Sequence, residues 1–142
     1  MKGVWFGVDV GTVRVGVARS DPSGILASPV ITLPRDAASD SDLDALAELI
    51  AESGAVGVVV GLPITLRGRE TESAAMARRY AEALAERISP IPVRHVDERL
   101  TTVSAERKLR SGGVRGSRAT RAVIDQAAAV ELLQGWLDAD PR

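Results

Sequence analysis

Hydrophobic positions along the chain repeat with two different periods, which separate predicted strands from predicted helices. Residues 4–10 are apolar on both faces, the pattern of a central buried strand. Residues 14–18 alternate between apolar and other positions, which predicts the second strand of a hairpin after the turn Gly11-Thr12. Short apolar runs predict three more strands, at residues 30–33, 56–60 and 93–96.

Apolar residues at helical spacing predict four helices, at residues 40–53, 71–87, 101–110 and 117–138. The last helix is expected to pack through five apolar residues: Val123, Ala127, Val130, Leu133 and Leu137. Strands and helices alternate in the second half of the chain, so we expect an α/β fold with a mixed central sheet and helices on both faces. The length of 142 residues suits a single domain, residues 1–142.

The composition of the chain excludes some classes of protein function and leaves others open. The chain has no cysteine, which excludes disulfides and cysteine metal sites and is consistent with a cytoplasmic protein. We expect no signal peptide and no membrane association, because no apolar run approaches the roughly 20 residues of a membrane helix. The net charge is only -1, but the segment 99–121 carries seven basic residues against one acid. A basic segment on an acidic body is compatible with phosphate binding, and equally with a solvated helix face.

Acidic residues stand at three places where a charge is costly. Asp9 lies near the end of a buried strand, Asp97 and Glu98 end another strand, and Asp125 lies on or near the apolar face of the last helix. Clustered carboxylates repel one another unless a cation neutralises them, and ligand sets made only of oxygen favour Mg²⁺ or Mn²⁺. Two such ions can support phosphodiester cleavage.

Local pairing explains each acid equally well when it is taken alone. Asp9 can bond the turn that follows it, and Glu98 can pair with a neighbouring arginine. Asp125 can pair with Arg121, four residues earlier on the same helix. The three acids together favour the metal site, although spacing alone does not show that they converge.

Glycines surround Asp9 in the pattern D-x-G-T-x-R-x-G-V-A, which lets backbone or phosphate approach closely. This hairpin also occurs in the sugar-kinase and actin group, where it holds ATP phosphates. Those proteins close a second domain over the nucleotide, and 142 residues leave no room for one. A nuclease is therefore preferred to a phosphotransferase or ATPase.

Four motifs in order resemble one family along nearly the whole chain. They are GVDVGTVRVGVARSD (7–21), VVVGLP (58–63) with Gly68 and Glu72 after it, VDERLTT (96–102) and IDQAAAVELLQGWLD (124–138). The chain resembles the YqgF family, also called RuvX, the Holliday junction resolvase group. That resemblance implies an RNase H-like fold and nuclease activity on structured nucleic acid, with a role in maturing the 16S ribosomal RNA precursor at its 5′ end.

The resemblance also assigns residues. It implies that Asp9, Glu98 and Asp125 are the catalytic and metal-binding acids, with Asp9 bridging two Mg²⁺ or Mn²⁺ ions. Glu98 is preferred to Asp97, since resolvases of this fold use glutamate on that strand and adjacent strand residues point to opposite faces. The residues expected to contact nucleic acid are Thr12, Arg14, Arg99, Thr101, Arg115, Arg118 and Arg121. The last three belong to a glycine-rich basic segment that is equally well explained as a plain connector.

Two rival functions stay open beside RNA cleavage. The same site suits a resolvase of branched DNA, which requires a homodimer matched to the junction, whereas RNA cleavage suits a monomer as well. A non-catalytic ribosome-assembly factor, with ribosome-associated partners, would bind nucleic acid without needing Mg²⁺. Aromatic residues make up only 3% of the chain, so recognition by backbone and shape is expected rather than base stacking.

Overall fold

The computed structural model describes residues 2–63, 71–98 and 118–139, except for the side chains of residues 118–122. Its strands are β1 (Trp5–Val10), β2 (Arg14–Ser20), β3 (Ala27–Pro34), β4 (Gly57–Leu62) and β5 (Val93–Asp97). Its helices are α1 (Ser41–Glu52), α2 (Glu72–Ile88) and α4 (Arg118–Ala139). The helix predicted at residues 101–110 lies outside the described residues.

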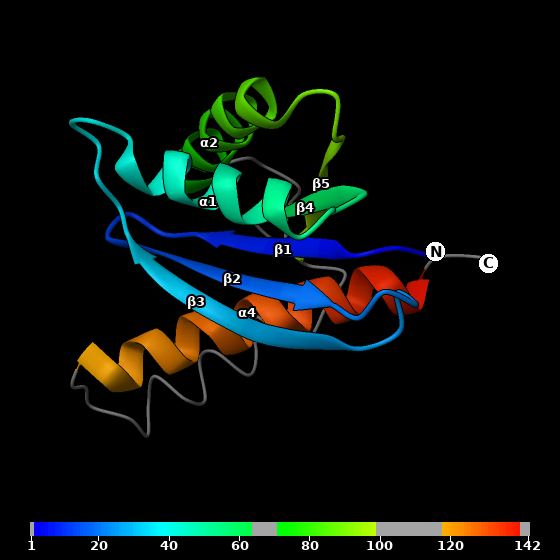
Figure 1. Ribbon diagram of the computed structural model, residues 1–142. Coiled ribbons are helices and arrows are strands. Elements are labelled where there is room, and N and C mark those ends of the chain that lie inside the picture. The colour runs from blue at the N-terminus through cyan, green and yellow to red at the C-terminus, as the bar shows by residue number, and fades with distance from the viewer. Residues whose placement is uncertain (1, 64–70, 99–117, 140–142) are drawn as a thin grey trace.

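The five strands form one mixed sheet in the order β3-β2-β1-β4-β5 (Figure 1). Strands β1, β2 and β3 form an antiparallel meander, while β4 and β5 run parallel to β1. The carboxyl ends of β1, β4 and β5 therefore share one edge with the start of β2. In Figure 1 the hairpin between β1 and β2 and the start of α4 lie at the left end of the molecule.

Helices cover both faces of the sheet, as predicted (Figure 1). Because side chains alternate along a strand, β1 sends Phe6, Val8 and Val10 into the core beneath α1 and α2. Trp5, on the opposite face, packs in a second core with Leu132, Leu133 and Leu137 of α4. Two apolar layers thus hold the sheet between α1 and α2 on one side and α4 on the other.

Two details differ from the sequence prediction. Strand β3 runs from Ala27 to Pro34 rather than over residues 30–33 only. It is the edge strand of the sheet, where prolines such as Pro29 are tolerated because one side of the backbone needs no ladder partner. Val123 does not pack in the core but is 64% exposed, and α4 instead buries Ala128 and Ala129 against the sheet.

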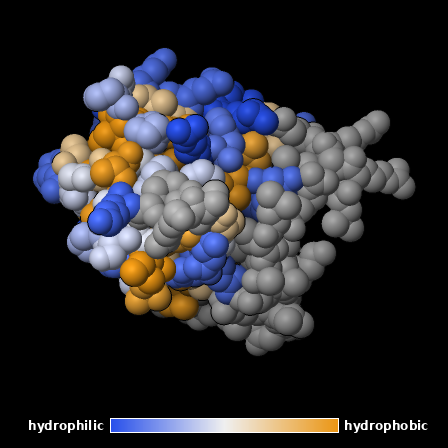
Figure 2. Space-filling view, turned by 90° about the vertical axis from the view of Figure 1, so that its right-hand side faces the viewer, coloured by the Kyte–Doolittle hydropathy of each residue, from blue (hydrophilic) through white to orange (hydrophobic). Residues whose placement is uncertain are grey.

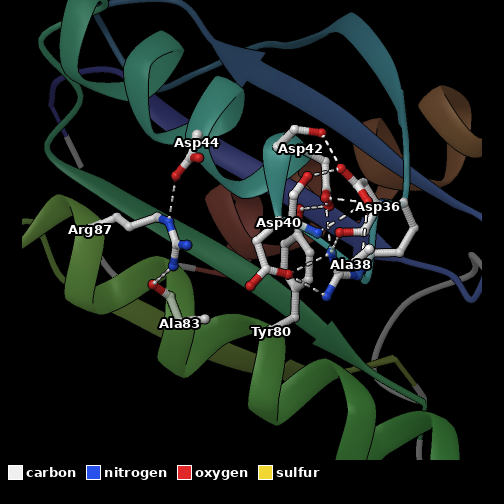
Figure 3. A network of polar contacts seen from close by, with 11 residues as sticks. Asp36, Ala38, Asp40, Asp42, Asp44, Tyr80, Ala83 and Arg87 are labelled. Carbon is white, nitrogen blue, oxygen red and sulfur yellow. Dashed lines mark hydrogen bonds and ion pairs between the residues drawn. The ribbon is translucent and has the colours of Figure 1, made fainter.

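A polar network ties the loop after β3 to both helices of the first layer (Figure 3). The carboxylate of Asp42, 1% exposed, accepts hydrogen bonds from Arg35 (2.9 Å), from the backbone N–H of Asp36 (3.1 Å) and from the Tyr80 hydroxyl (2.9 Å). Burial, together with this bond to Asp42, raises the pKa of Tyr80. The network closes the α1 and α2 side of the sheet, opposite α4.

The loop before α1 is shaped by hydrogen bonds to the carboxylate of Asp36. Asp40 occupies the N-cap position, but its side chain makes no capping hydrogen bond and its carboxylate binds Arg35 instead. The carboxylate of Asp36 accepts hydrogen bonds from the hydroxyls of Ser39 and Ser41, and these bonds hold the pKa of Asp36 well below its usual value.

Among the described residues, no helix is both long and apolar enough to cross a membrane. Figure 2 shows the side of the molecule that lies to the right in Figure 1, and there small apolar patches are interspersed with hydrophilic side chains. Scattered exposed apolar residues of this kind are normal on protein surfaces.

Candidate active site

Asp9 lies on the face of the sheet that α4 covers. Two residues earlier on the same strand, a Cβ atom built on Gly7 would lie 2.7 Å from Leu133 of α4. Side chains two apart on a strand share a face, so Asp9 points to this side as well. Asp9 pairs with Gly16 of β2, and the register Val8–Val60 places Gly61 of β4 next to Asp9 on its other side. Asp9 therefore stands between two glycines in one row across the sheet.

Asp125 of α4 lies directly over the first of these glycines. A Cβ atom on Gly16 would stand only 2.2 Å from the carbonyl oxygen of Asp125 and 3.2 Å from its Cβ atom. Any side chain at Gly16 would push the helix away. The missing side chain lets the backbone of α4 rest on the sheet and brings Asp125 beside Asp9.

Glu98 lies over the second glycine. A Cβ atom on Gly61 would be 3.2 Å from Cγ and 3.3 Å from Cδ of Glu98, and 3.0 Å from Leu132 of α4. The Glu98 residue is 5% exposed. Asp97 instead pairs with Leu62, which belongs to the core under α1 and α2, so its side chain points to the other face. Of the two adjacent acids, Glu98 is the one on the side of Asp9.

The carboxylate of Asp125 is bound by Arg14 from the start of β2. The Nε atom of Arg14 donates to Oδ2 of Asp125 at 2.7 Å, and the two side chains are 29% and 23% exposed. Arg14 is two residues before Gly16, so it lies on the same face of the sheet. The sequence had suggested Arg121 as the local partner of Asp125, and the side chain of Arg121 lies outside the described residues.

The chemical type of the donor atoms in this site suits a hard divalent cation. Asp9, Glu98 and Asp125 supply only carboxylate oxygens, which Mg²⁺ and Mn²⁺ prefer, and the two glycines let Asp125 and Glu98 lie close to the sheet on either side of Asp9. Within the described ranges, no three acidic or histidine side chains are already close enough together to hold an ion. The site thus has the right ligands, with Asp125 turned toward Arg14.

The other residues predicted to contact nucleic acid are only partly placed. Thr12 is exposed in the turn between β1 and β2, at the same edge of the sheet as Asp9. Arg118 and Arg121 lie in the first turns of α4, where only the backbone is described. Arg99, Thr101 and Arg115 lie outside the described residues.

The glycines beside Asp9 contribute more to the site than their positions in the sequence predicted. The sequence marked the glycines around Asp9 as points of close approach but left the approaching group open, and it ended the predicted strand at residue 60, before Gly61. The structure places Gly61 within β4, and its neighbour is Glu98. The sequence does contain a signal for these close contacts, namely glycines inside strands that are otherwise made of apolar β-branched residues. A glycine inside a strand marks a place where another group approaches the backbone closely.

Comparison with known proteins agrees with this architecture. The structure of T. thermophilus RuvC in complex with Holliday junction substrate superposes with a TM-score of 0.59, covering 96% of this chain and 94% of that one at 14% identity. A second T. thermophilus RuvC structure gives a TM-score of 0.53 at 13% identity. The mixed five-stranded sheet between helices, with this likeness, defines an RNase H-like fold.

Sequence comparison identifies the family. A family model described as "RuvX: Holliday junction resolvase" matches residues 3–139, so the chain belongs to the RuvX family. A relative from Mycobacteroides abscessus is 57% identical over 137 residues, covering 96% of this chain and 82% of the relative. One from Mycobacterium leprae is 60% identical over 137 residues, covering 96% and 73%. Both relatives are named "Putative pre-16S rRNA nuclease".

Proposed function

We propose that this chain is a metal-dependent endonuclease that cuts structured RNA, with the 5′ region of the 16S ribosomal RNA precursor as its substrate in the cytoplasm. The observation that carries the proposal is the row of Gly16, Asp9 and Gly61, with Asp125 above one glycine and Glu98 above the other. The names of the relatives at 57% and 60% identity support the choice of substrate.

The position of each acid suggests its task. Asp9 is central and would contact both ions, whereas Glu98 and Asp125 flank it and would each hold one. When bound, two divalent ions supply a nucleophile at neutral pH and stabilise charge on the leaving oxygen. The site lies at the carboxyl ends of parallel strands, where open α/β sheets commonly bind ligands.

Thr12 and Arg14 lie at the same edge of the sheet and are proposed to contact the phosphate. An exposed hydroxyl and a guanidinium both donate hydrogen bonds to phosphate oxygens. Arg14 provides a positive charge beside Asp125, on the face of the sheet where Asp9 and Glu98 also lie. Its guanidinium would orient a phosphodiester without reading its sequence.

The family model and the RuvC structures favour a second candidate, cleavage of four-way DNA junctions. Symmetric cleavage of a junction requires two active sites and thus a homodimer, whereas RNA cleavage does not. The same assay distinguishes the two candidates if both substrates are offered.

The test is cleavage of a labelled 16S precursor fragment and of a four-way DNA junction, with Mg²⁺, with Mn²⁺ and with a chelator. The proteins are the wild type, Asp9→Asn and the control Asp138→Asn, which removes an exposed carboxylate near the end of α4. We expect metal-dependent cutting of the RNA by the wild type and the control, and none by Asp9→Asn. Full activity of Asp9→Asn would refute the site. Metal-independent binding without cutting would instead favour an assembly factor.

A further inference from the structure

Arg14 and Asp125 form the contact that joins β2 to α4 within the candidate site. They are 111 positions apart in sequence, and the Nε–Oδ2 distance is 2.7 Å. Both side chains are partly buried, at 29% and 23% exposure. The contact therefore occupies one oxygen of an acid that the proposed function needs as a cation ligand.

Helix α4 does not depend on this contact for its position. Its Leu132, Leu133 and Leu137 are at most 1% exposed. The side chain of Gln134 also holds the loop before β3, accepting from the N–H of Ala27 at 2.9 Å and donating to the carbonyl of Ile25 at 2.8 Å. A partly exposed ion pair stabilises a fold less than one buried leucine does. Removing the ion pair should therefore change the surroundings of the Asp125 carboxylate rather than the packing of α4 on the sheet.

Charge gives the contact a more specific role. Asp9, Glu98 and Asp125 lie on one face of the sheet, and carboxylates brought together around a site repel one another unless a positive charge is present. The guanidinium of Arg14 neutralises one of them and binds it through a charge-assisted hydrogen bond. A divalent cation that binds the same carboxylate has to displace Arg14, or else bind next to the positive charge of its guanidinium, which repels it.

We propose that Arg14 is an internal counter-ion that competes with the divalent cation for Asp125, so that it weakens cation binding in the absence of nucleic acid. This inference rests on the proposed function, because it requires Asp125 to be a cation ligand. A guanidinium binds phosphate as readily as carboxylate. A substrate phosphate can therefore draw Arg14 away from Asp125, which couples loading of the cation to binding of the substrate.

The test is calorimetric titration of Mn²⁺ into the protein without nucleic acid. It compares the wild type, Arg14→Gln, Asp125→Asn and the control Arg19→Gln, whose arginine lies at the far end of β2 and bonds Ser53. We expect Arg14→Gln to bind Mn²⁺ about two- to fivefold more tightly than the wild type, the range set by a partly exposed ion pair. Arg19→Gln should match the wild type, and Asp125→Asn should bind more weakly.

The outcomes separate this inference from the proposed function. Equal or weaker binding by Arg14→Gln, with Asp125→Asn clearly impaired, overturns the counter-ion role and leaves the metal site standing. Absence of Mn²⁺ binding by the wild type overturns both. If Arg14→Gln unfolds at the titration temperature, Arg14→Met replaces it, because methionine keeps an unbranched side chain and removes the positive charge. Tighter binding by that variant supports the role, and unchanged binding overturns it.

Discussion

Gly16→Ala tests whether the seating of α4 on the sheet sets the geometry of the site. The added Cβ atom would lie 2.2 Å from the carbonyl oxygen and 2.6 Å from the carbonyl carbon of Asp125. Both of these atoms belong to the backbone of a helix, so no side-chain rotation can relieve the overlap. Ordinary contacts begin at 3.4 Å, so the helix and Asp125 must withdraw from Asp9 by about 1 Å.

Two effects of this withdrawal can be given a size. Overpacking of a tight interface costs about 1–3 kcal/mol of unfolding free energy. A displacement of about 1 Å in a reacting constellation can cost on the order of 100-fold in rate. We therefore expect Gly16→Ala to stay folded at 25 °C while its metal-dependent cleavage rate falls about 100-fold.

Gly57→Ala is the matched control for this experiment. A Cβ atom on Gly57, in β4, would lie 2.3 Å from the ring of Trp5, so the overlap is of similar size and on the same face of the sheet. Trp5 is four residues before Asp9 on β1, so this overlap lies away from the site. Urea unfolding and single-turnover cleavage of the precursor fragment are measured for both variants. Similar losses of stability with a loss of activity only in Gly16→Ala would support the account. Equal activity of the two variants would refute the reasoning.

Two further predictions concern the polar network on the opposite face. Tyr80→Phe removes a donor to the buried carboxylate of Asp42 and should lower the unfolding free energy by about 1.5–3 kcal/mol in urea, whereas a change below about 0.5 kcal/mol would contradict that assignment. The pKa of Asp36 is lowered from 3.8 by the Ser39 and Ser41 hydroxyls, so its charged form stabilises the fold above that pH and this contribution is lost as the pH falls. The wild type should therefore exceed Asp36→Asn in stability at pH 6, and this advantage should begin to shrink below pH 3.8 and be lost only at much lower pH, where the folded protein takes up the proton. An equal difference at pH 6 and at pH 2 would count against it.

The order of the elements followed from hydrophobic periodicity, but the contact face of α4 followed from it only in part. The predicted stripe correctly placed Leu133 and Leu137 in the core, but it also included Val123, which proved to be exposed. The structure brings the helix so close to Gly7 and Gly16 that small residues, Ala128 and Ala129, face the sheet. Alanines give little hydrophobic signal, so this stripe becomes visible only when the facing glycines are known.

The candidate acids could be named from the sequence, whereas their arrangement could not. The orientation of Asp97 and Glu98 depends on the register of β5 against β4, which no local pattern fixes. The pairing of Asp125 with Arg14 spans 111 positions, so the local rule for helical ion pairs pointed to a different arginine. Long-range packing decided both features.

The central claim is that the acids on the α4 face of the sheet carry the chemistry. Single-turnover cleavage of the precursor fragment by Glu98→Gln and by Asp97→Asn tests it most directly, because the two residues are adjacent and point to opposite faces. The account predicts a loss of about 100-fold or more in the metal-dependent rate for Glu98→Gln, and a rate near that of the wild type for Asp97→Asn. A larger loss for Asp97→Asn, or no loss for Glu98→Gln, would contradict it.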